Sequence, residues 1–490
     1  MLRKLILVSV ILGCFCQIGA GEELIQTPAA IHISSTISDG KYSISEIAEI
    51  AKQNNIKIVI LTNSDFMRWE YGLWPLQRII KKTVETNSVF NYGIRKYLKE
   101  IEEAQRKNPN LVLIAGVESA PLYYWEGSPF KNNLKMYNWH KHMLVIGLDK
   151  VNDYKMLPSI ANRYSLKLPY KFKDIYRFWP ILLLIIGILC LRERKFRYKD
   201  LQGRPLGPYS RVWQIFGICI IIFSLLFLLN NFPFCSFKYD QYHGEQGIGP
   251  YQNLIDYVNK RGGLTFWAHP EAENIEKRDR VNIETREHSN NLLEARDYTG
   301  FAVFYEGYKK VGPPGGIWDE VLKQYCQGRR KMPVWAIGGL AFDQTGDLGE
   351  YMQDLRTIFL IPHLTKQAAL EALREGRIYV VRGKEKLVLD RFIVGDSLSD
   401  INGAMGDEID VSGNPILRIS GHFAGGQSEL VKIYLIRNGD VIKTFEVKSP
   451  FEINYSDEYL DKGKKIYYRL EIHYPGGILI TNPIFVKFRQ

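Results

Sequence analysis

The sequence predicts an α/β fold in which a (β/α) barrel is interrupted by a two-helix transmembrane hairpin and followed by an all-β, immunoglobulin-like domain. Short apolar strands alternate with amphipathic helices over residues 24–176 and again over residues 232–376, an alternation that is typical of parallel strands. Two uncharged apolar runs lie between these parts, within residues 177–231. From residue 386 to residue 490, short alternating strands are separated by Gly, Asn and Asp turns, the pattern of a β-sandwich.

The composition is that of a folded protein with two or three domains. The chain has 490 residues, of which 46% are hydrophobic and 24% are charged, so it is globular rather than disordered. Lys and Arg outnumber Asp and Glu by 64 to 53, a net charge of +11. Part of this excess surrounds the apolar runs, so we interpret it as membrane-flanking charge and expect no nucleic-acid partner.

Residues 1–20 are predicted to form a secretory signal peptide. Arg3 and Lys4 precede an apolar run from Leu5 to Cys16, and small residues lie near a cleavage point after Ala20, which is the layout of such a signal. The alternative is an uncleaved membrane anchor. Both versions place the folded parts of the chain outside the cytoplasm.

The first barrel part, residues 24–176, begins as a β-α-β unit. Its first helix carries Ile44, Ile47, Ala48 and Ala51 at helical spacing, so one face of that helix is expected to be buried. The predicted elements are a strand at 29–35, a helix at 43–55, a strand at 56–62, a helix at 89–107 and strands at 111–119 and 142–149.

Residues 177–231 are predicted to cross a membrane twice. The runs at 178–191 and 212–229 contain no charge and carry Trp179 and Trp213 near their ends, as interfacial anchors would. The loop from 192 to 211 has seven basic and two acidic residues, so the positive-inside rule assigns it to the cytoplasm. The first run is short, and a buried core helix is its alternative.

The second barrel part, residues 232–376, repeats the alternation of strands and helices. The expected elements are a helix at 251–260, strands at 263–270 and 300–308, a helix at 317–327, a strand at 334–339 and a helix at 365–375. The sandwich at 386–490 contains a hairpin turn at 437–440. One disulfide between Cys235 and Cys326 is allowed in an exported protein, and the spacing does not establish it.

Imidazoles and carboxylates lie at the ends of the predicted strands. They are His32, Asp39, Glu118, His142 and His269. Because the carboxyl ends of parallel strands meet at one edge of a barrel, these side chains are expected to converge. Nitrogen and carboxylate oxygen are suitable ligands for zinc-like ions.

The segments around these residues resemble the motifs of the PHP (polymerase and histidinol phosphatase) family of metal-dependent phosphoesterases. The matching segments are His32-Ile33-Ser34, Ser38-Asp39-Gly40, Thr62-Asn63-Ser64, Gly116-Val117-Glu118 and Ala268-His269-Pro270. The resemblance implies a PHP-like barrel over 29–149 and 251–343. It implies that Glu118, His142 and His269 are ligands of one metal position. His32 would be a further ligand, or would act with Asp39 on the substrate.

Several positions depart from the family pattern. Ser34 replaces the second histidine of the opening pair, Asn63 and Ser64 replace an Asp and a His, and Leu340 and Phe342 replace the closing Asp and His. Serine and asparagine are poor ligands for such metals, and leucine and phenylalanine are not ligands. We therefore expect one divalent ion, zinc, manganese or iron, or none.

Two functions follow from this resemblance. The first is an extracytoplasmic, membrane-anchored phosphoesterase that acts on a phosphorylated small molecule. The second is a catalytically inactive module that binds an envelope ligand, with the aromatic segment Leu122–His142 as a binding loop or as a packed lid over the barrel. In both, the lipid bilayer is a partner.

Overall fold

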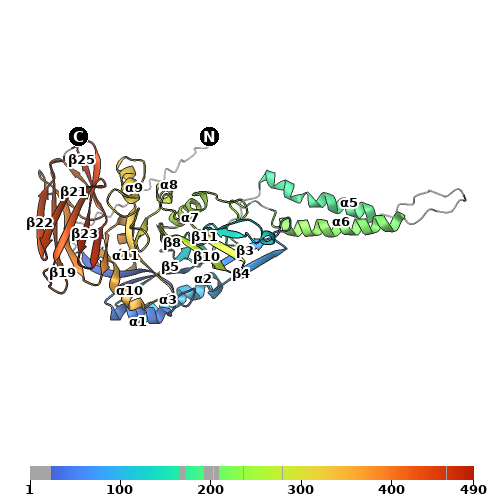
Figure 1. Cartoon of the computed structure of the whole chain (residues 1–490), viewed down its shortest axis with the longest axis horizontal. Coiled ribbons are helices and arrows are strands. Elements are labelled where there is room, and N and C mark those ends of the chain that lie inside the picture. The colour runs from blue at the N-terminus through green and yellow to red at the C-terminus, as the bar shows by residue number, and fades with distance from the viewer. Residues whose placement is uncertain are drawn as a thin grey trace, which may run out of the picture.

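The computed structural model describes residues 24–162, 164, 171–191, 202, 209–234, 237–278, 280–459 and 461–489. The predicted signal peptide at 1–20, most of the basic loop at 192–211, and Cys235 of the predicted disulfide lie outside these residues. Figure 1 shows an elongated molecule: a barrel lies at its centre, C-terminal sheets lie at one end, and two helices project from the other end.

A closed barrel forms the centre of the described chain. Its strands, in spatial order, are β1 (Ile25–Ile33), β2 (Ile58–Ser64), β5 (Val112–Ser119), β8 (Met143–Ile146), β9 (Leu264–Trp267), β12 (Gly300–Phe304) and β13 (Trp335–Phe342). Parallel pairing between β13 and β1 closes the circuit. The predicted barrel of alternating strands and helices is therefore present.

One strand departs from the predicted parallel arrangement. Strand β8 is antiparallel to both of its neighbours, β5 and β9, whereas the other neighbouring pairs of the barrel are parallel. A parallel return normally needs a crossover helix, and the segment between β5 and β8 supplies short strands and one short 3₁₀ turn instead. The amino end of β8 consequently lies at the edge where the parallel strands have their carboxyl ends.

Helices cover the outside of the barrel. Helix α1 (Ile44–Gln53) begins with a capping box formed by Ser43 and Glu46 and buries its apolar face, as the sequence predicts. The other helices around the barrel are α2 (Val89–Tyr92), α3 (Ile94–Lys107), α4 (Val151–Lys155), α7 (Gly249–Asn259), α8 (Asn291–Glu294), α9 (Ile317–Cys326), α10 (Leu348–Asp354) and α11 (Lys366–Glu375).

Short strands form a cap near the carboxyl edge of the barrel. One sheet has the order β10 (Asn274–Arg278), β11 (Val281–Thr285), β7 (Lys135–Tyr137) and β6 (Tyr124–Glu126), and the chain between β6 and β7 contains the 3₁₀ turn η1 (Pro129–Lys131). A separate hairpin consists of β3 (Arg68–Gly72) and β4 (Lys81–Glu85). Trp69, Tyr123, Trp125 and Trp139 are buried together between these strands. Of the other aromatic side chains in the Leu122–His142 segment, Tyr124 and Tyr137 are buried in the main core and Phe130 is exposed.

The predicted hairpin is present as two adjacent apolar helices that project from the barrel (Figure 1). They are α5 (Pro180–Leu191), preceded by the 3₁₀ turn η2 (Phe172–Phe178), and α6 (Tyr209–Asn231). The stretches Asp174–Leu191 and Val212–Asn231 are long and apolar enough to cross a membrane. The first is 18 residues long, because it includes part of the helical turn η2, with Asp174 and Arg177, before the predicted start at residue 178. Few side chains of either stretch are buried, unlike those of a core helix.

Close contact between small residues holds the two helices together. A Cβ added at Gly187 would lie 3.0 Å from the carbonyl oxygen of Gly217, and one added at Gly217 would lie 2.8 Å from the carbonyl oxygen of Gly187. The hydroxyl of Ser224 also donates to the carbonyl of Pro180 at 2.6 Å. Small residues and interhelical hydrogen bonds of this kind are typical of paired transmembrane helices.

The C-terminal part consists of two sheets that share one apolar core. Strands β16 (Leu387–Asp396), β17 (Asn402–Gly403), β19 (Pro415–Phe423) and β22 (Phe451–Ser456) form one sheet. The other contains β18 (Glu408–Val411), β20 (Leu430–Arg437), β21 (Asp440–Lys448), β23 (Lys465–Tyr474), β24 (Gly477–Thr481) and β25 (Ile484–Phe488).

The second of these sheets continues into the barrel. Strand β14 (Leu355–Ile361) pairs with β1, and β15 (Ile378–Gly383) pairs with both β14 and β24. A hydrogen-bonded sheet therefore extends from the barrel wall to the C-terminal part. A buried ion pair reinforces the junction: Arg469 of β23 contacts Asp319 of α9 at 2.7 Å, with both side chains fully buried.

Candidate metal centre

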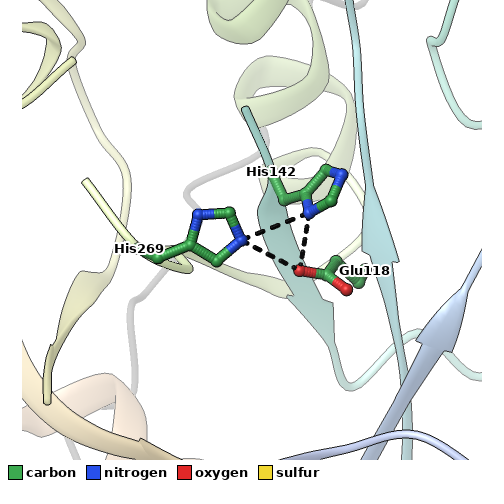
Figure 2. A group of neighbouring side chains, drawn as sticks. All are labelled: Glu118, His142 and His269. Atoms are coloured by element: carbon green, nitrogen blue, oxygen red, sulfur yellow. Dashed lines mark hydrogen bonds and ion pairs between the residues drawn. The ribbon is translucent and has the colours of Figure 1, made fainter. Parts of the chain in front are cut away.

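The candidate site lies at the edge of the barrel where the parallel strands end. Glu118 is near the end of β5, His269 follows β9, and His142 immediately precedes β8. The reversed direction of β8 brings His142 to the same edge as the other two. Figure 2 shows the three side chains pointing toward one another.

Three donor atoms of this site lie close together. Nδ1 of His142 is 2.9 Å and Nε2 of His269 is 3.5 Å from Oε1 of Glu118, and the two nitrogens are 3.3 Å apart. These atoms form the group of possible metal ligands found among the described residues. The three predicted ligands of one metal position therefore converge.

The backbone orients the ring of His142. Its Nε2 donates to the carbonyl oxygen of Trp139 at 2.9 Å. The proton of the neutral ring is consequently on Nε2, and Nδ1 directs a lone pair toward Glu118. Metal-binding histidines are typically held by such a hydrogen bond from their second nitrogen. The contact between Nδ1 and Glu118 needs either a second proton on the ring or a cation, because two lone pairs repel each other.

Charge interactions within the cluster stabilise ionised side chains. Burial alone would raise the pKa of Glu118, but the charges of His142 and His32, together with hydrogen bonds from His142 and His269, hold the pKa well below its ordinary value. Burial would likewise lower the pKa of His142, and the neighbouring Glu118 carboxylate outweighs it, so that the pKa is raised. Without a metal, Glu118 and His142 thus form a buried ion pair.

His32 approaches the same carboxylate from β1. Its Nε2 is 3.1 Å from Oε1 of Glu118. The residue has a positive φ of 69°, and the register of β1 against β2 and β13 shifts between Ile31 and Ile33. Irregularities of this kind re-aim a side chain beside an active site, and a positive φ is uncommon in residues other than glycine. The backbone of β1 therefore departs from regular geometry at the residue that contacts Glu118.

Asp39 occupies a different position from the other predicted residues. Its Oδ1 accepts a hydrogen bond from the hydroxyl of Ser38 at 2.8 Å. It contributes to the raised pKa of His142 through its charge. Asp39 is thus near the cluster but is not a member of the close group of donors.

Two titratable residues beside the cluster were not selected from the sequence. Asp65 follows β2 and is buried, and burial, offset in part by a hydrogen bond from the backbone N–H of Phe66, raises its pKa to about 7. His140 lies 3.4 Å from Glu276 of β10, and burial together with the charge of His142 lowers its pKa to about 4. The one sequence signal for His140 was its position two residues before His142.

The positions that depart from the family pattern have structural roles. Oδ1 of Asn63 accepts hydrogen bonds from the backbone N–H of Ser35 at 2.7 Å and from the hydroxyl of Ser35 at 3.0 Å. It also lies 3.0 Å from the hydroxyl of Ser38, whose one proton is shared between Asn63 and Asp39. Leu340 is buried in the main core, and Phe342 stacks on Tyr42. These positions therefore hold the ends of β1, β2 and β13 by hydrogen bonding and packing.

The spacing of the donors fits a tetrahedral metal ion. Zinc bonds to histidine and carboxylate of about 2.0–2.1 Å place tetrahedral ligand atoms roughly 3.3 Å apart, and the observed separations are 2.9, 3.3 and 3.5 Å. Two imidazoles and one carboxylate leave a fourth position for water or substrate, as in catalytic zinc sites. The residues present therefore fit one divalent ion.

Among the comparisons with known proteins, only the comparison with solved structures found matches. No family model matches the chain, and no curated protein matches it. A two-domain protein of Bacteroides vulgatus that contains a predicted PHP-like metal-dependent phosphoesterase is 11% identical, with a TM-score of 0.32, and the match covers 91% of this chain and 90% of that chain.

Two further solved structures are similar. A candidate metal-dependent phosphoesterase of Bifidobacterium adolescentis is 14% identical with a TM-score of 0.26, over 65% of this chain and 89% of that chain. An amidohydrolase of Chromobacterium violaceum, with bound sulfate and no metal, is 13% identical with a TM-score of 0.27, over 71% of this chain and 96% of that chain.

Proposed function

We propose that this chain is a membrane-anchored hydrolase of the PHP type that binds one divalent metal ion and cleaves a phosphate ester outside the cytoplasm. The observation that carries the proposal is the convergence of Glu118, His142 and His269 at ligand spacing, with the protonated nitrogen of His142 turned away from the cluster. Zinc, manganese or iron suits this donor set. The expected substrate is a phosphorylated small molecule.

Each residue of the cluster has a separate task in this proposal. A divalent ion bound there would polarise a phosphoryl oxygen and lower the pKa of water. Glu118, His142 and His269 would hold that ion. His32, whose Nε2 lies 3.1 Å from the carboxylate of Glu118, and Asp39, which lies near the cluster, would act on the substrate rather than hold the ion.

A single ion rather than a larger cluster is part of the proposal. It is supported by the amide of Asn63, a family ligand position, whose Oδ1 accepts hydrogen bonds from the backbone and the hydroxyl of Ser35. It is also supported by Leu340 and Phe342, which are buried apolar residues at two others. With one ion, stabilisation of both the attacking and the leaving oxygen by a metal pair is not available, so slow turnover is expected.

Membrane anchoring rests on α5 and α6. Their exposed apolar surfaces support a pair of membrane spans, and the basic residues of the loop between them support a cytoplasmic loop. This topology places the barrel and the C-terminal sheets on the outer side. The predicted signal peptide at 1–20 supports the same orientation.

An inactive binding module is the second candidate. The same replacements favour it, because Asn63, Leu340 and Phe342 have taken structural roles at positions where the family pattern has ligands. In that case Glu118 and the histidines would be a buried hydrogen-bonded cluster. The cap would then bind an envelope ligand.

Metal content of the full chain purified in detergent tests the proposal. Wild type should retain about one equivalent of metal after dialysis without chelator, and Glu118→Gln should retain little, because a single carboxylate contributes to this site. Glu102→Gln, on the exposed face of α3, is the matched control and should bind as wild type. Phosphatase activity on p-nitrophenyl phosphate should follow metal content.

Absence of metal from folded wild type, even after incubation with zinc, manganese or iron, would overturn the enzyme proposal and leave the binding module. Equal metal in wild type and Glu118→Gln would place the metal elsewhere. Metal retention without hydrolysis of any phosphate ester would favour the second candidate.

A further inference from the structure

A groove lies on the cap, separate from the cluster of donors. Its volume is about 910 Å³, and it is lined by residues of β3 and β4, of the chain from Pro129 to Leu134, and of the β10–β11 hairpin. The apolar part of its wall includes Trp69, Tyr71 and Leu134. A groove of this size can accommodate a drug-sized or lipid-sized ligand.

Apolar side chains around this groove are unusually exposed. Phe130 and Ile80 of the groove wall are 82% and 50% exposed, and Trp74, which follows Leu73 of the wall, is 83% exposed. They lie on two segments, the β3–β4 turn and η1. Single exposed apolar residues are ordinary, but a group at one groove indicates an interaction surface.

Cations accompany these apolar residues. The groove wall contains Lys81, Lys82, Arg278 and Arg280, and none of its described lining residues is acidic. Lys81 contacts Glu70 at 2.9 Å and Arg278 contacts Glu276 at 3.0 Å. Lys82 and Arg280 are exposed and are available for an anion.

The cap is attached to the end of α6. Asn230 accepts a hydrogen bond from the backbone N–H of Arg78 at 2.9 Å and donates to the carbonyl of Pro75 at 3.3 Å. The guanidinium of Arg78 donates to the carbonyl of Phe232 at 2.6 Å. Figure 1 shows β3, β4, β10 and β11 at the end of the barrel from which α5 and α6 project. The turn between β3 and β4 is therefore fixed at the depth where the second apolar stretch ends.

We infer that this face of the cap binds an anionic phospholipid of the bilayer that receives α5 and α6. Trp74 lies next to Pro75, and tryptophan is enriched at the interface between water and lipid. The exposed cations would contact the headgroup phosphate, and the apolar wall would contact an acyl chain. This inference rests on the membrane anchoring in the proposed function, and it is independent of metal binding.

Tryptophan quenching in lipid nanodiscs tests the inference. The full chain is placed in nanodiscs that contain phosphatidylglycerol and phosphatidylcholine, with or without bromine near the top of the acyl chains. The difference in tryptophan emission between wild type and Trp74→Phe gives the contribution of Trp74. The difference between wild type and Trp179→Phe gives the contribution of Trp179, at the start of α5. Bromine should quench more than half of the Trp74 contribution, together with that of Trp179.

The two parts of the proposal fail differently. Quenching of Trp179 without quenching of Trp74 overturns the lipid-binding face and leaves the membrane anchor in place. Quenching of neither overturns both. Weaker quenching of Trp74 at higher protein concentration, together with dimers in the nanodisc, also overturns the inference. In that case a second copy of the chain covers the groove.

Headgroup charge is tested with paired variants. Lys82→Glu combined with Arg280→Glu should reduce the quenching of Trp74 in nanodiscs with phosphatidylglycerol. Lys443→Glu combined with Lys448→Glu, on the exposed strand β21, changes the net charge equally and should leave the quenching unchanged. Equal quenching in all variants and in pure phosphatidylcholine would overturn recognition of an anionic lipid.

Discussion

The buried ion pair between Asp319 and Arg469 is expected to control the stability of the junction between the barrel and the C-terminal sheets. The guanidinium donates two hydrogen bonds to the carboxylate, at 2.8 and 2.7 Å, and both side chains are fully buried. The hydroxyl of Tyr467 donates a third bond to Asp319 at 2.8 Å. In Asp319→Asn the charge of Arg469 remains buried without its paired carboxylate, which costs about 3–5 kcal/mol.

Removal of both charges should cost much less than the sum of the two single substitutions. In the double variant Asp319→Asn and Arg469→Met, no buried charge remains, and such replacements are often neutral. The temperature of half-unfolding in detergent, measured at one heating rate, is the assay. Glu320→Gln on the same helix removes the exposed contact of Glu320 with Lys323 at 2.8 Å, so it should cost under about 0.5 kcal/mol. The reasoning is refuted if Asp319→Asn has the same temperature of half-unfolding as Glu320→Gln. It is also refuted if the double variant loses as much stability as the two single variants, Asp319→Asn and Arg469→Met, lose together.

Three further predictions concern the site and the helices. In metal-free wild type, the raised pKa of His142 contributes stability below its ordinary value of about 6.5, and this stability is lost as pH rises through the higher folded pKa. In Glu118→Gln, burial should lower the pKa of His142, so stability should instead fall as pH decreases through about 6.5. Melting temperatures measured with chelator at several pH values would contradict this if they changed with pH in the same direction in both proteins. Ser34→His should leave metal content at one equivalent, because Leu340 is buried where the family pattern has another ligand, an Asp. Two equivalents of metal by elemental analysis would disprove this prediction. Gly187→Leu should separate α5 from α6, since a Cβ there meets Gly217; an unchanged yield of engineered cysteine cross-links between the helices would count against this packing.

The sequence predicted much of the barrel because local signals agreed with the final structure. The helix around Ile47 has both a capping box and an apolar face, and the strands of the barrel are short and apolar. The direction of β8 could not be predicted, because apolar spacing is the same in parallel and antiparallel strands. It depends on the cap segment before it, whose aromatic side chains are buried by contacts with Trp69 and Ile283, distant in sequence.

The candidate site was predicted only where its residues have local sequence signals. Glu118, His142 and His269 had local motifs at strand ends, whereas Asp65 is distinguished by burial, which is a property of the folded chain. The groove of the cap was also beyond sequence reasoning, because Trp69, Phe130 and Val281 of its wall come from three separate segments. The pairing of β11 with β7 brings two of these segments together, and the contact of Arg78 with the end of α6 fixes the β3–β4 turn beside the apolar helices.

The shared sheet makes the C-terminal part an unsuitable unit for genetic exchange. Strand β15 pairs with β24 along its length, and Asn482 exchanges hydrogen bonds with the backbone of Ala336 in the barrel. A chain shortened before residue 386 would expose the edge of β15 as a template for aggregation. Recombination at that point would therefore yield two incomplete proteins, so the two parts should be inherited and expressed as one piece.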